Sequence, residues 1–362
     1  MKKLFIARLS CLLAITLSLT VSCSDVSDGL GSSSLTLTAE RLYFPANGKA
    51  SPEFIVLNQK QEDVTEFATI FYNGEELTDR FTTTEIGSYN FVATYEGMES
   101  DTLTIESELH RTNKKVLLED FTAEWCGWCP QASYNIGLLL EEDDNVLAVE
   151  IHHNSDPVGF ADVELIRTQL DVKAWPGSRV GRVRPDVGFN TSKLSSAVTW
   201  EITKQMDHQE LLAGIAINTA LSGSNVTVDV DLEFYNDINK DVGLTIYLIE
   251  NNVVGVLQQN YFSGDEVYSE AYFYSQPKEI PDYIHHRVLR KVATDIYGDD
   301  LPLSETVRGN EYSHEQKTID ISDYDADNCY VIAFLHYSLD GEIKTILNAQ
   351  QVKVGGSIGF EE

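Results

Sequence analysis

Two cysteines separated by two residues are the feature of this sequence most suited to chemistry. Cys126 and Cys129 follow a short apolar run and open a segment with helical spacing. Free backbone N–H groups and the helix dipole at a helix start stabilise a thiolate, and there the pKa of a thiol can fall from about 8.5 to about 7 or below. Cys129 lies one turn farther on and is able to attack a mixed disulfide formed at Cys126. The spacing predicts a thiol–disulfide exchange site.

A CxxC pair can instead supply half of a zinc site, which needs two further ligands. The chain has five cysteines and no second CxxC, and Cys329 opens an apolar run typical of a buried small side chain. Residues 237–241 resemble the start of a calcium loop, and 320–327 carry four aspartates, but turns and solvated loops are the preferred interpretation. We predict no metal and no cofactor.

The first residues indicate export. Lys2, Lys3 and Arg8 precede an apolar run that ends at Val21, which is shorter than the roughly 20 residues that span a bilayer. The stretch that ends at Cys23 resembles the lipobox of bacterial lipoproteins, in which the cysteine is lipidated. We expect a signal peptide over 1–22, a lipid on Cys23, a flexible tether over 23–34 and an outer-membrane location, periplasmic or cell-surface. A plain secretory signal is the alternative.

The chain is strongly acidic, with 57 Asp and Glu against 26 Lys and Arg and a formal net charge of −31. Such a surface repels nucleic acid and anionic lipid headgroups, so neither is an expected partner apart from membrane attachment through the lipid. Acidity does not identify a substrate.

Three folded parts are predicted to position the cysteines. Short alternating runs over 35–108 are typical of a small immunoglobulin-like β-sandwich. Strands alternate with helices over 109–209, which predicts an α/β domain with a parallel crossover. Strands dominate again over 210–356 and favour a second β-sandwich. The α/β part is expected to contain strands at 116–121, 146–151 and 179–183, and helices at 126–142, 161–170 and 194–206.

Residues 115–130 resemble the active-site strand and turn of the thioredoxin superfamily. The resemblance implies that Asp120 is a buried acid beneath the cysteines and assists proton transfer. It also implies that Pro176 is a cis-proline beside the disulfide. With this likeness, the predicted fold class is α+β multidomain, with a thioredoxin-like α/β domain between two β-sandwiches. Trp125, Trp128 and Trp175 would then form an apolar substrate groove.

The chain as a whole resembles the outer-membrane-protein-28-related lipoproteins of Gram-negative bacteria. The likeness covers roughly residues 110–355, and its carriers are the CxxC strand, the segment 282–290 and the segment 347–352. It implies location and architecture more than a reaction. His152 and His153 follow the second predicted strand. A solvated loop is the preferred interpretation, and the alternative is that one of them favours a thiolate at Cys126.

Two functions follow from these features. The first is an envelope thiol–disulfide oxidoreductase that acts on cysteine-containing envelope proteins. Cys126 attacks and Cys129 resolves, while the redox direction stays open because related pairs range from about −270 to −120 mV. The second is a surface binding or assembly lipoprotein, in which the CxxC is a structural disulfide and the β-sandwiches contact partners.

Overall fold

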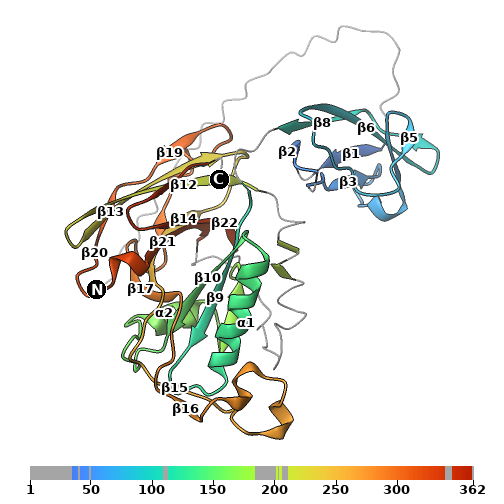
Figure 1. The fold of residues 1–362 in the computed structure, drawn as a ribbon. Coiled ribbons are helices and arrows are strands. Elements are labelled where there is room, and N and C mark those ends of the chain that lie inside the picture. Colours follow the sequence, from blue (N-terminus) through green and yellow to red (C-terminus); the bar gives the residue numbers. More distant parts are fainter. Residues whose placement is uncertain are drawn as a thin grey trace, which may run out of the picture.

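The computed structural model describes residues 35–39, 41–48, 50–108, 113–183, 201–202, 204–205, 211–338 and 345–360 (Figure 1). Strands predominate in this part of the chain, which contains the α-helices α1 (Cys129–Glu142) and α2 (Val163–Gln169). The predicted signal peptide, Cys23, the tether and most of the predicted helix over 194–206 lie outside the described residues.

Residues 35–108 fold around an apolar core of their own, which includes Val56, Phe91 and Ile105. One sheet pairs β1 with β3, and the other has the order β2-β8-β6-β4-β5, with β7 paired to β6. The strands are β1 (Thr36–Ala39), β2 (Tyr43–Pro45), β3 (Phe54–Leu57), β4 (Thr69–Tyr72), β5 (Glu75–Glu76), β6 (Gly87–Tyr95), β7 (Met98–Glu99) and β8 (Leu103–Glu108).

A mixed eight-stranded sheet forms the centre of the remaining chain, in the order β11-β9-β10-β17-β14-β21-β22 with β18 paired to β14. β9 is parallel to β10, and β10 is parallel to β17, whereas the other pairs are antiparallel. The strands are β9 (Val116–Thr122), β10 (Val146–His152), β11 (Gly177–Val180), β14 (Val242–Glu250), β17 (Val288–Val292), β18 (Asp299–Asp300), β21 (Cys329–Tyr337) and β22 (Ile346–Lys353).

The predicted fold class is wrong, because residues 109–209 do not form a thioredoxin-like α/β domain. The sheet does not end at β10: its outer edge pairs with β17, and the sheet continues through β14, β21 and β22. An apolar strand must satisfy both hydrogen-bonding edges, and its sequence does not reveal which distant strand occupies each edge. The protein is instead mostly β, with several sheets.

A second sheet packs on one face of the eight-stranded sheet. Its order is β19-β13-β12-β23, with β20 paired to β13; the bounds are β12 (Ala213–Ser222), β13 (Asn225–Phe234), β19 (Glu311–Ser313), β20 (Lys317–Asp320) and β23 (Ser357–Ile358). Ile246 of β14 points into the core between these sheets, and its neighbour Tyr247 into the core on the opposite face. Both faces are covered, which explains why all nine residues of β14 are buried.

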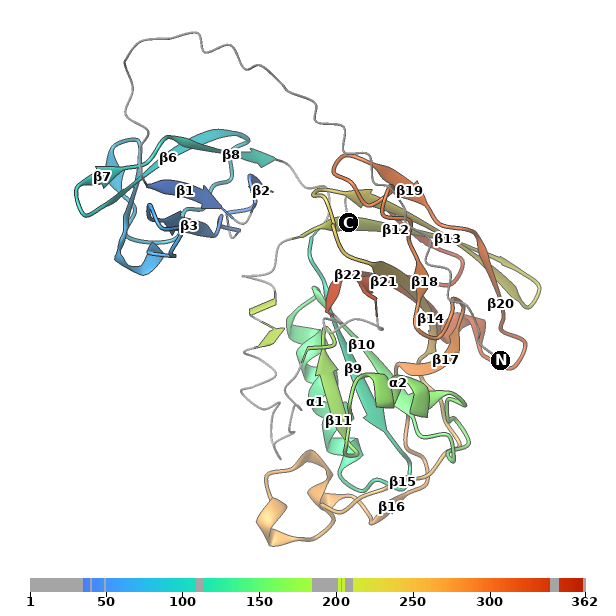
Figure 2. The same cartoon turned by 180° about the vertical axis from the view of Figure 1, so that it is seen from behind.

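The two helices cover opposite faces of β9 and β10, as Figures 1 and 2 show. Ile136 of α1 packs with Leu118 of β9, whereas Ile166 of α2 packs with Leu117 and Val149. Adjacent residues of β9 therefore pack against different helices, because successive side chains along a strand point to opposite faces of the sheet.

Some predicted boundaries also need correction. α1 begins at Cys129 and not at Cys126; Pro130 stands in its first turn, where the missing N–H leaves no intrahelical bond unmade. The part predicted as a second β-sandwich, 210–356, also contains the 3-10 turns η2 (Glu266–Tyr268) and η3 (Tyr272–Ser275). These turns belong to the loop between β15 (Gln258–Gln259) and β16 (Glu279–Ile280).

Candidate functional site

Cys126 and Cys129 form a disulfide at the start of α1, with their Cα atoms 5.4 Å apart. Cys126 lies in the turn before the helix, and its carbonyl oxygen accepts a hydrogen bond from the Cys129 N–H at 3.0 Å. Both side chains are nearly buried, with 4% of Cys126 and 1% of Cys129 exposed. Cys126 is therefore the more accessible of the two sulfur-bearing residues.

An aromatic group borders the disulfide. Trp175, which precedes the cis Trp175–Pro176 peptide bond, packs against the cysteine pair. Its ring centroid lies 6.0 Å from that of Trp125 and 5.3 Å from that of His153. Trp125 is 43% exposed. The structure thus brings together Trp125 and Trp175, as the resemblance implied, and adds His153 to them.

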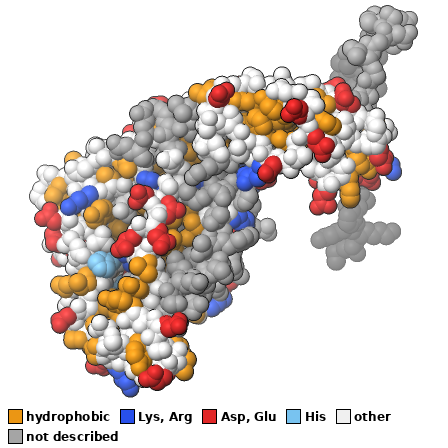
Figure 3. Space-filling model, turned by 45° about the vertical axis from the view of Figure 1, so that its right-hand side comes forward, with side chains coloured by type: hydrophobic (Ala, Val, Ile, Leu, Met, Phe, Trp, Pro, Cys, Tyr) orange, Lys and Arg blue, Asp and Glu red, His pale blue; other side chains and the backbone are white. Residues whose placement is uncertain are grey.

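Trp128 belongs to a different aromatic group. Its ring makes edge contacts with Tyr261, Phe262 and Tyr268, at centroid distances of 5.5, 5.1 and 5.2 Å. All three partners lie in or beside the loop between β15 and β16, at the lower end of the molecule in Figure 1. Apolar side chains also gather at this end of the face shown in Figure 3. The three tryptophans of the predicted groove therefore belong to two separate aromatic clusters.

Asp120 is fully buried in β9, where its Oδ1 atom accepts a hydrogen bond of 2.5 Å from the Ser178 hydroxyl of β11. Its Oδ2 atom is buried without a hydrogen-bond partner among the described residues. Burial, reinforced by the nearby Glu150 carboxylate, raises the pKa of Asp120 well above its usual value. The Asp120 carboxyl group therefore holds its proton to a higher pH than a solvated aspartate does, which suits a group that exchanges protons.

Glu150 and Arg287 form a buried ion pair on the strand next to Asp120. Arg287 Nη2 lies 2.6 Å from Glu150 Oε1, and the Ser133 hydroxyl of α1 donates to the same oxygen at 2.6 Å. Burial alone would raise the pKa of Glu150, but Arg287 and Ser133 hold it below the usual value. Sequence reasoning noticed the segment that contains Arg287 but gave it no role, because its partner lies 137 residues away.

His152 is buried inside β10, so its interpretation as a solvated loop residue is wrong. Its Nδ1 atom lies 3.0 Å from Asp156 Oδ2, which also accepts the backbone N–H of Glu124 at 2.8 Å. The ring of His285 packs edge-on at 5.0 Å. Burial, together with the charge of His152, lowers the pKa of His285 to about 4. This network reaches the CxxC turn through Glu124.

Residues 258–261 run along the CxxC turn and were missed by sequence reasoning. The Gln259 N–H donates to the Glu124 carbonyl at 2.8 Å, and the Tyr261 N–H donates to the Gly127 carbonyl at 2.9 Å. The buried side-chain amide of Gln258 lies within hydrogen-bonding distance of the carbonyl oxygens of Ala123, Glu124 and Cys126, at 3.3, 3.1 and 3.0 Å. A Cβ atom at Gly127 would lie 2.3 Å from the Tyr261 ring, so this close approach requires glycine.

A second buried charge pair involves Glu119, the residue before Asp120 in β9. Arg182 Nε is 3.0 Å from Glu119 Oε2, and the Tyr247 hydroxyl donates to Glu119 Oε1 at 3.1 Å. The Arg182 and Glu119 side chains are both 0% exposed. Burial, followed by the Glu119 charge, raises the pKa of Tyr247. These contacts link three parts of the sheet: Glu119 lies in β9, Arg182 follows β11, and Tyr247 lies in β14.

The other sequence candidates stand apart from this site. Cys329 is buried at the start of β21, as predicted. Within the described ranges, no group of three or more His, Cys, Asp or Glu side chains could hold a metal ion. In the same part of the chain, no helix has the length and apolar character needed to cross a membrane.

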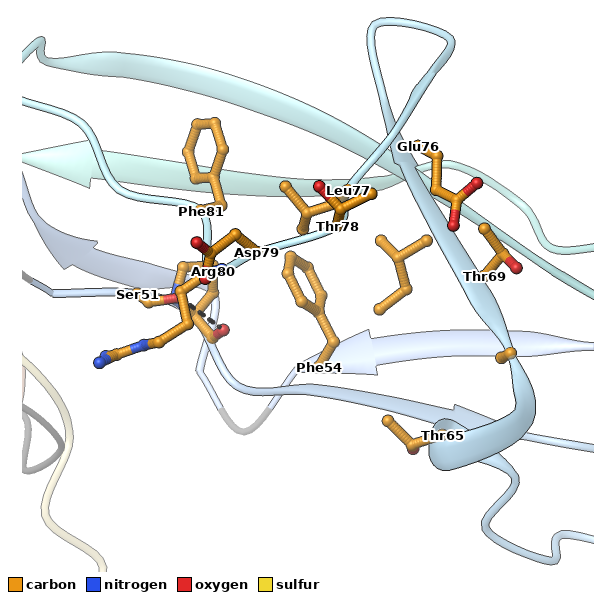
Figure 4. A pocket seen from close by; sticks show the side chains of 13 residues that line it. Ser51, Phe54, Thr65, Thr69, Glu76, Leu77, Thr78, Asp79, Arg80 and Phe81 are labelled. Atoms are coloured by element: carbon orange, nitrogen blue, oxygen red, sulfur yellow. Dashed lines mark hydrogen bonds between the residues drawn. The ribbon is translucent and has the colours of Figure 1, made fainter.

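A cleft of about 360 Å³ lies in the N-terminal unit, between the loop after β5 and strands β3 and β4. Phe54, Leu77 and Phe81 contribute apolar walls, and Arg80 and Thr69 contribute polar groups (Figure 4). None of the predicted site residues lines it. The cleft therefore adds no chemistry to the cysteine pair.

Comparison with solved structures shows one informative similarity of fold. HBP35 of Porphyromonas gingivalis is 24% identical to this chain, with a TM-score of 0.52 over 67% of this chain and 76% of its own. A β-glucosidase from Kluyveromyces marxianus has 10% identity and a TM-score of 0.19, over 80% of this chain and 42% of its own, which does not indicate a shared fold. No curated protein matches the sequence.

A family model described as outer membrane protein Omp28 matches residues 167–357. The match includes β11 and the strands of the large sheet from β14 to β22. It also includes residues 258–261, which contact the CxxC turn. It extends over more than half of the chain, and the chain therefore belongs to the Omp28 outer membrane protein family.

Proposed function

We propose that this protein is an envelope thiol–disulfide oxidoreductase whose redox couple is Cys126–Cys129. The observation that carries the proposal is the disulfide at the start of α1, against which the indole of Trp175 packs. The strand that precedes the CxxC turn also carries the buried carboxyl group of Asp120. Ionisable groups with strongly shifted pKa values, such as Asp120, are typical of functional sites.

In the proposed reaction, the thiolate of reduced Cys126 attacks one sulfur of a substrate disulfide. A mixed disulfide forms, and the other substrate sulfur leaves as a thiolate. Cys129 then attacks the Cys126 sulfur, which closes the Cys126–Cys129 disulfide and releases the second substrate thiolate. Two electrons pass to the substrate, and the reverse sequence oxidises a substrate dithiol. Asp120 is the group proposed to accept the proton of the Cys129 thiol as a carboxylate and to return that proton in the reverse direction.

The test uses single-cysteine variants in insulin-disulfide reduction and in thiol oxidation. Cys126→Ser is expected to abolish both activities, because no attacking sulfur remains. Cys129→Ser is expected to accumulate mixed disulfides, visible by nonreducing electrophoresis and mass spectrometry. Cys329→Ala is the matched control, since that buried thiol lies outside the site and its loss should leave activity unchanged. A wild-type protein with no activity in either assay would contradict the proposed function.

A second candidate is a surface binding or assembly protein in which Cys126–Cys129 is a structural disulfide. The specific observation in its favour is the burial of both cysteines, since exchange requires access to a sulfur. Its partners would contact the β-sheets of the N-terminal unit or of the C-terminal part. This candidate predicts a pair that resists glutathione, whereas the first predicts one that equilibrates with it.

Membership of the Omp28 outer membrane protein family supports a location at the outer membrane. Attachment through a lipid on Cys23 is the finer proposal, and its support is the short apolar run that ends before that cysteine. Metabolic labelling with a palmitate analogue tests it: wild type should carry the label, and Cys23→Ser should lose it. An unlabelled, membrane-bound wild type would contradict the lipid anchor. The substrates proposed are cysteine-containing envelope proteins.

A further inference from the structure

The carbonyl oxygens of the CxxC turn are held by a segment that lies about 130 residues later in the chain. Ala123, Glu124, Cys126 and Gly127 all have carbonyl oxygens within hydrogen-bonding distance of donors in residues 258–261. Three of these four oxygens approach one group, the side-chain amide of Gln258. The turn therefore takes its conformation partly from the C-terminal half of the chain.

We infer that Gln258 is a positioning residue for the Cys126–Cys129 couple, an inference that rests on the proposed exchange function. The Gln258 side chain is 2% exposed, so its N–H groups face carbonyl oxygens in a site that excludes water. Unpaired carbonyl groups beside Cys126 would present partial negative charge to its sulfur. The amide donor offsets that charge, which favours the thiolate and hence the reduced form of the pair.

The neighbouring glutamine provides an internal contrast. Gln259 directs its side chain away from the turn, where Nε2 lies 3.2 Å from Glu279 Oε1 in an exposed contact. Only the backbone N–H of Gln259 reaches the turn, at the Glu124 carbonyl. A substitution at Gln259 therefore retains the contact with the turn, whereas the same substitution at Gln258 removes the donor.

The experiment compares Gln258→Glu with Gln259→Glu in the full exported chain. Both add one negative charge at adjacent positions, but only Gln258→Glu replaces the donor with an acceptor that faces three carbonyl oxygens. We expect Gln258→Glu to raise the pKa of the Cys126 thiol, read from iodoacetamide alkylation rates against pH. The equilibrium constant of the couple should move at least about tenfold toward the disulfide, or about 30 mV. Gln259→Glu should stay within about twofold of wild type.

Gln258→Met separates the chemical role from a structural one, because it retains the side-chain length without the donor. It should shift the same equilibrium constant in the same direction, by roughly threefold to fivefold, as expected for the loss of a hydrogen bond worth about 1 kcal/mol. If Gln258→Glu does not fold, Gln258→Met decides by the same criterion. A lowered melting temperature with an unchanged equilibrium constant and thiol pKa would overturn the inference.

The reference couple separates this inference from the proposed function. Equilibration is measured against dithiothreitol as well as glutathione, so that a strongly reducing pair also gives a constant. A wild-type pair that glutathione does not reduce, yet whose constant shifts in the Gln258 variants, would refute the exchange function and retain the positioning role. Equal constants in all three variants and wild type would refute the positioning role alone.

Discussion

The two halves of the eight-stranded sheet bury different kinds of side chain. Where β14 and β21 pack against β12 and β13, aliphatic side chains such as Ile215, Ile246 and Leu335 fill the layer. Around β9 and β10, the interior also contains Glu119, Asp120 and other charged groups that are fully buried. A buried ion pair contributes little net stability, whereas apolar burial contributes about 25 cal/mol per Å². The comparison indicates that the apolar half stabilises the fold and the polar half sets the environment of the cysteines.

The largest expected effect comes from breaking the charge pair of the polar half. Arg182→Met leaves Glu119 buried without its counter-charge and should lower the free energy of unfolding by about 3–5 kcal/mol. Denaturation in urea at pH 7 measures the loss. The double variant with Glu119→Leu should recover most of it, because both charges are then absent. A loss below about 1 kcal/mol in the single variant would show that Glu119 is not truly desolvated.

A cavity in the apolar half should lower the free energy of unfolding slightly less than the broken charge pair does. It should not change the redox equilibrium of Cys126–Cys129. Leu335→Ala removes a fully buried side chain and is expected to lower the free energy of unfolding by about 2–5 kcal/mol. The glutathione equilibrium of Cys126–Cys129 should not change. Leu221→Ala is the matched control, since Leu221 is 44% exposed and should tolerate truncation. A shift of the redox equilibrium in Leu335→Ala would contradict the division between the halves.

The smallest of these effects depends on pH. The pKa of His285 is about 4 in the folded protein, below the usual 6.5, so only the unfolded chain gains this proton between those values. Stability is therefore lost as pH falls from about 6.5 to about 4, by up to about 3 kcal/mol for this group. His285→Gln should lose less stability over this interval, measured by urea denaturation at pH 7 and pH 5. Equal losses in variant and wild type would contradict the burial argument.

Several strands were readable from the sequence because they are long apolar runs. β9 and β10 begin at the predicted residues and end one residue beyond the strands predicted at 116–121 and 146–151. The burial of Asp120 and the cis bond before Pro176 match what the resemblance implied. The cysteine pair itself was visible from spacing alone. The predicted domain boundaries remain predictions.

The sequence did not reveal contacts between segments far apart in the chain. No element was predicted around Gln258, and the segment that contains Arg287 was interpreted as a short helix or a crossing loop. Nothing local indicates the oxygens that these two residues bind. The same limit produced the wrong fold class: the α/β pattern was real over 116–169, but the edge of β10 was completed by β17, which follows 136 residues after β10. Edge pairing depends on the whole chain and not on the periodicity of one segment.

The reduction potential of the Cys126–Cys129 pair, titrated against glutathione at pH 7, tests the exchange function most directly. A couple that works on envelope proteins should lie above about −300 mV, within reach of the glutathione pool. A value below about −300 mV would mark a structural disulfide and contradict the proposed oxidoreductase.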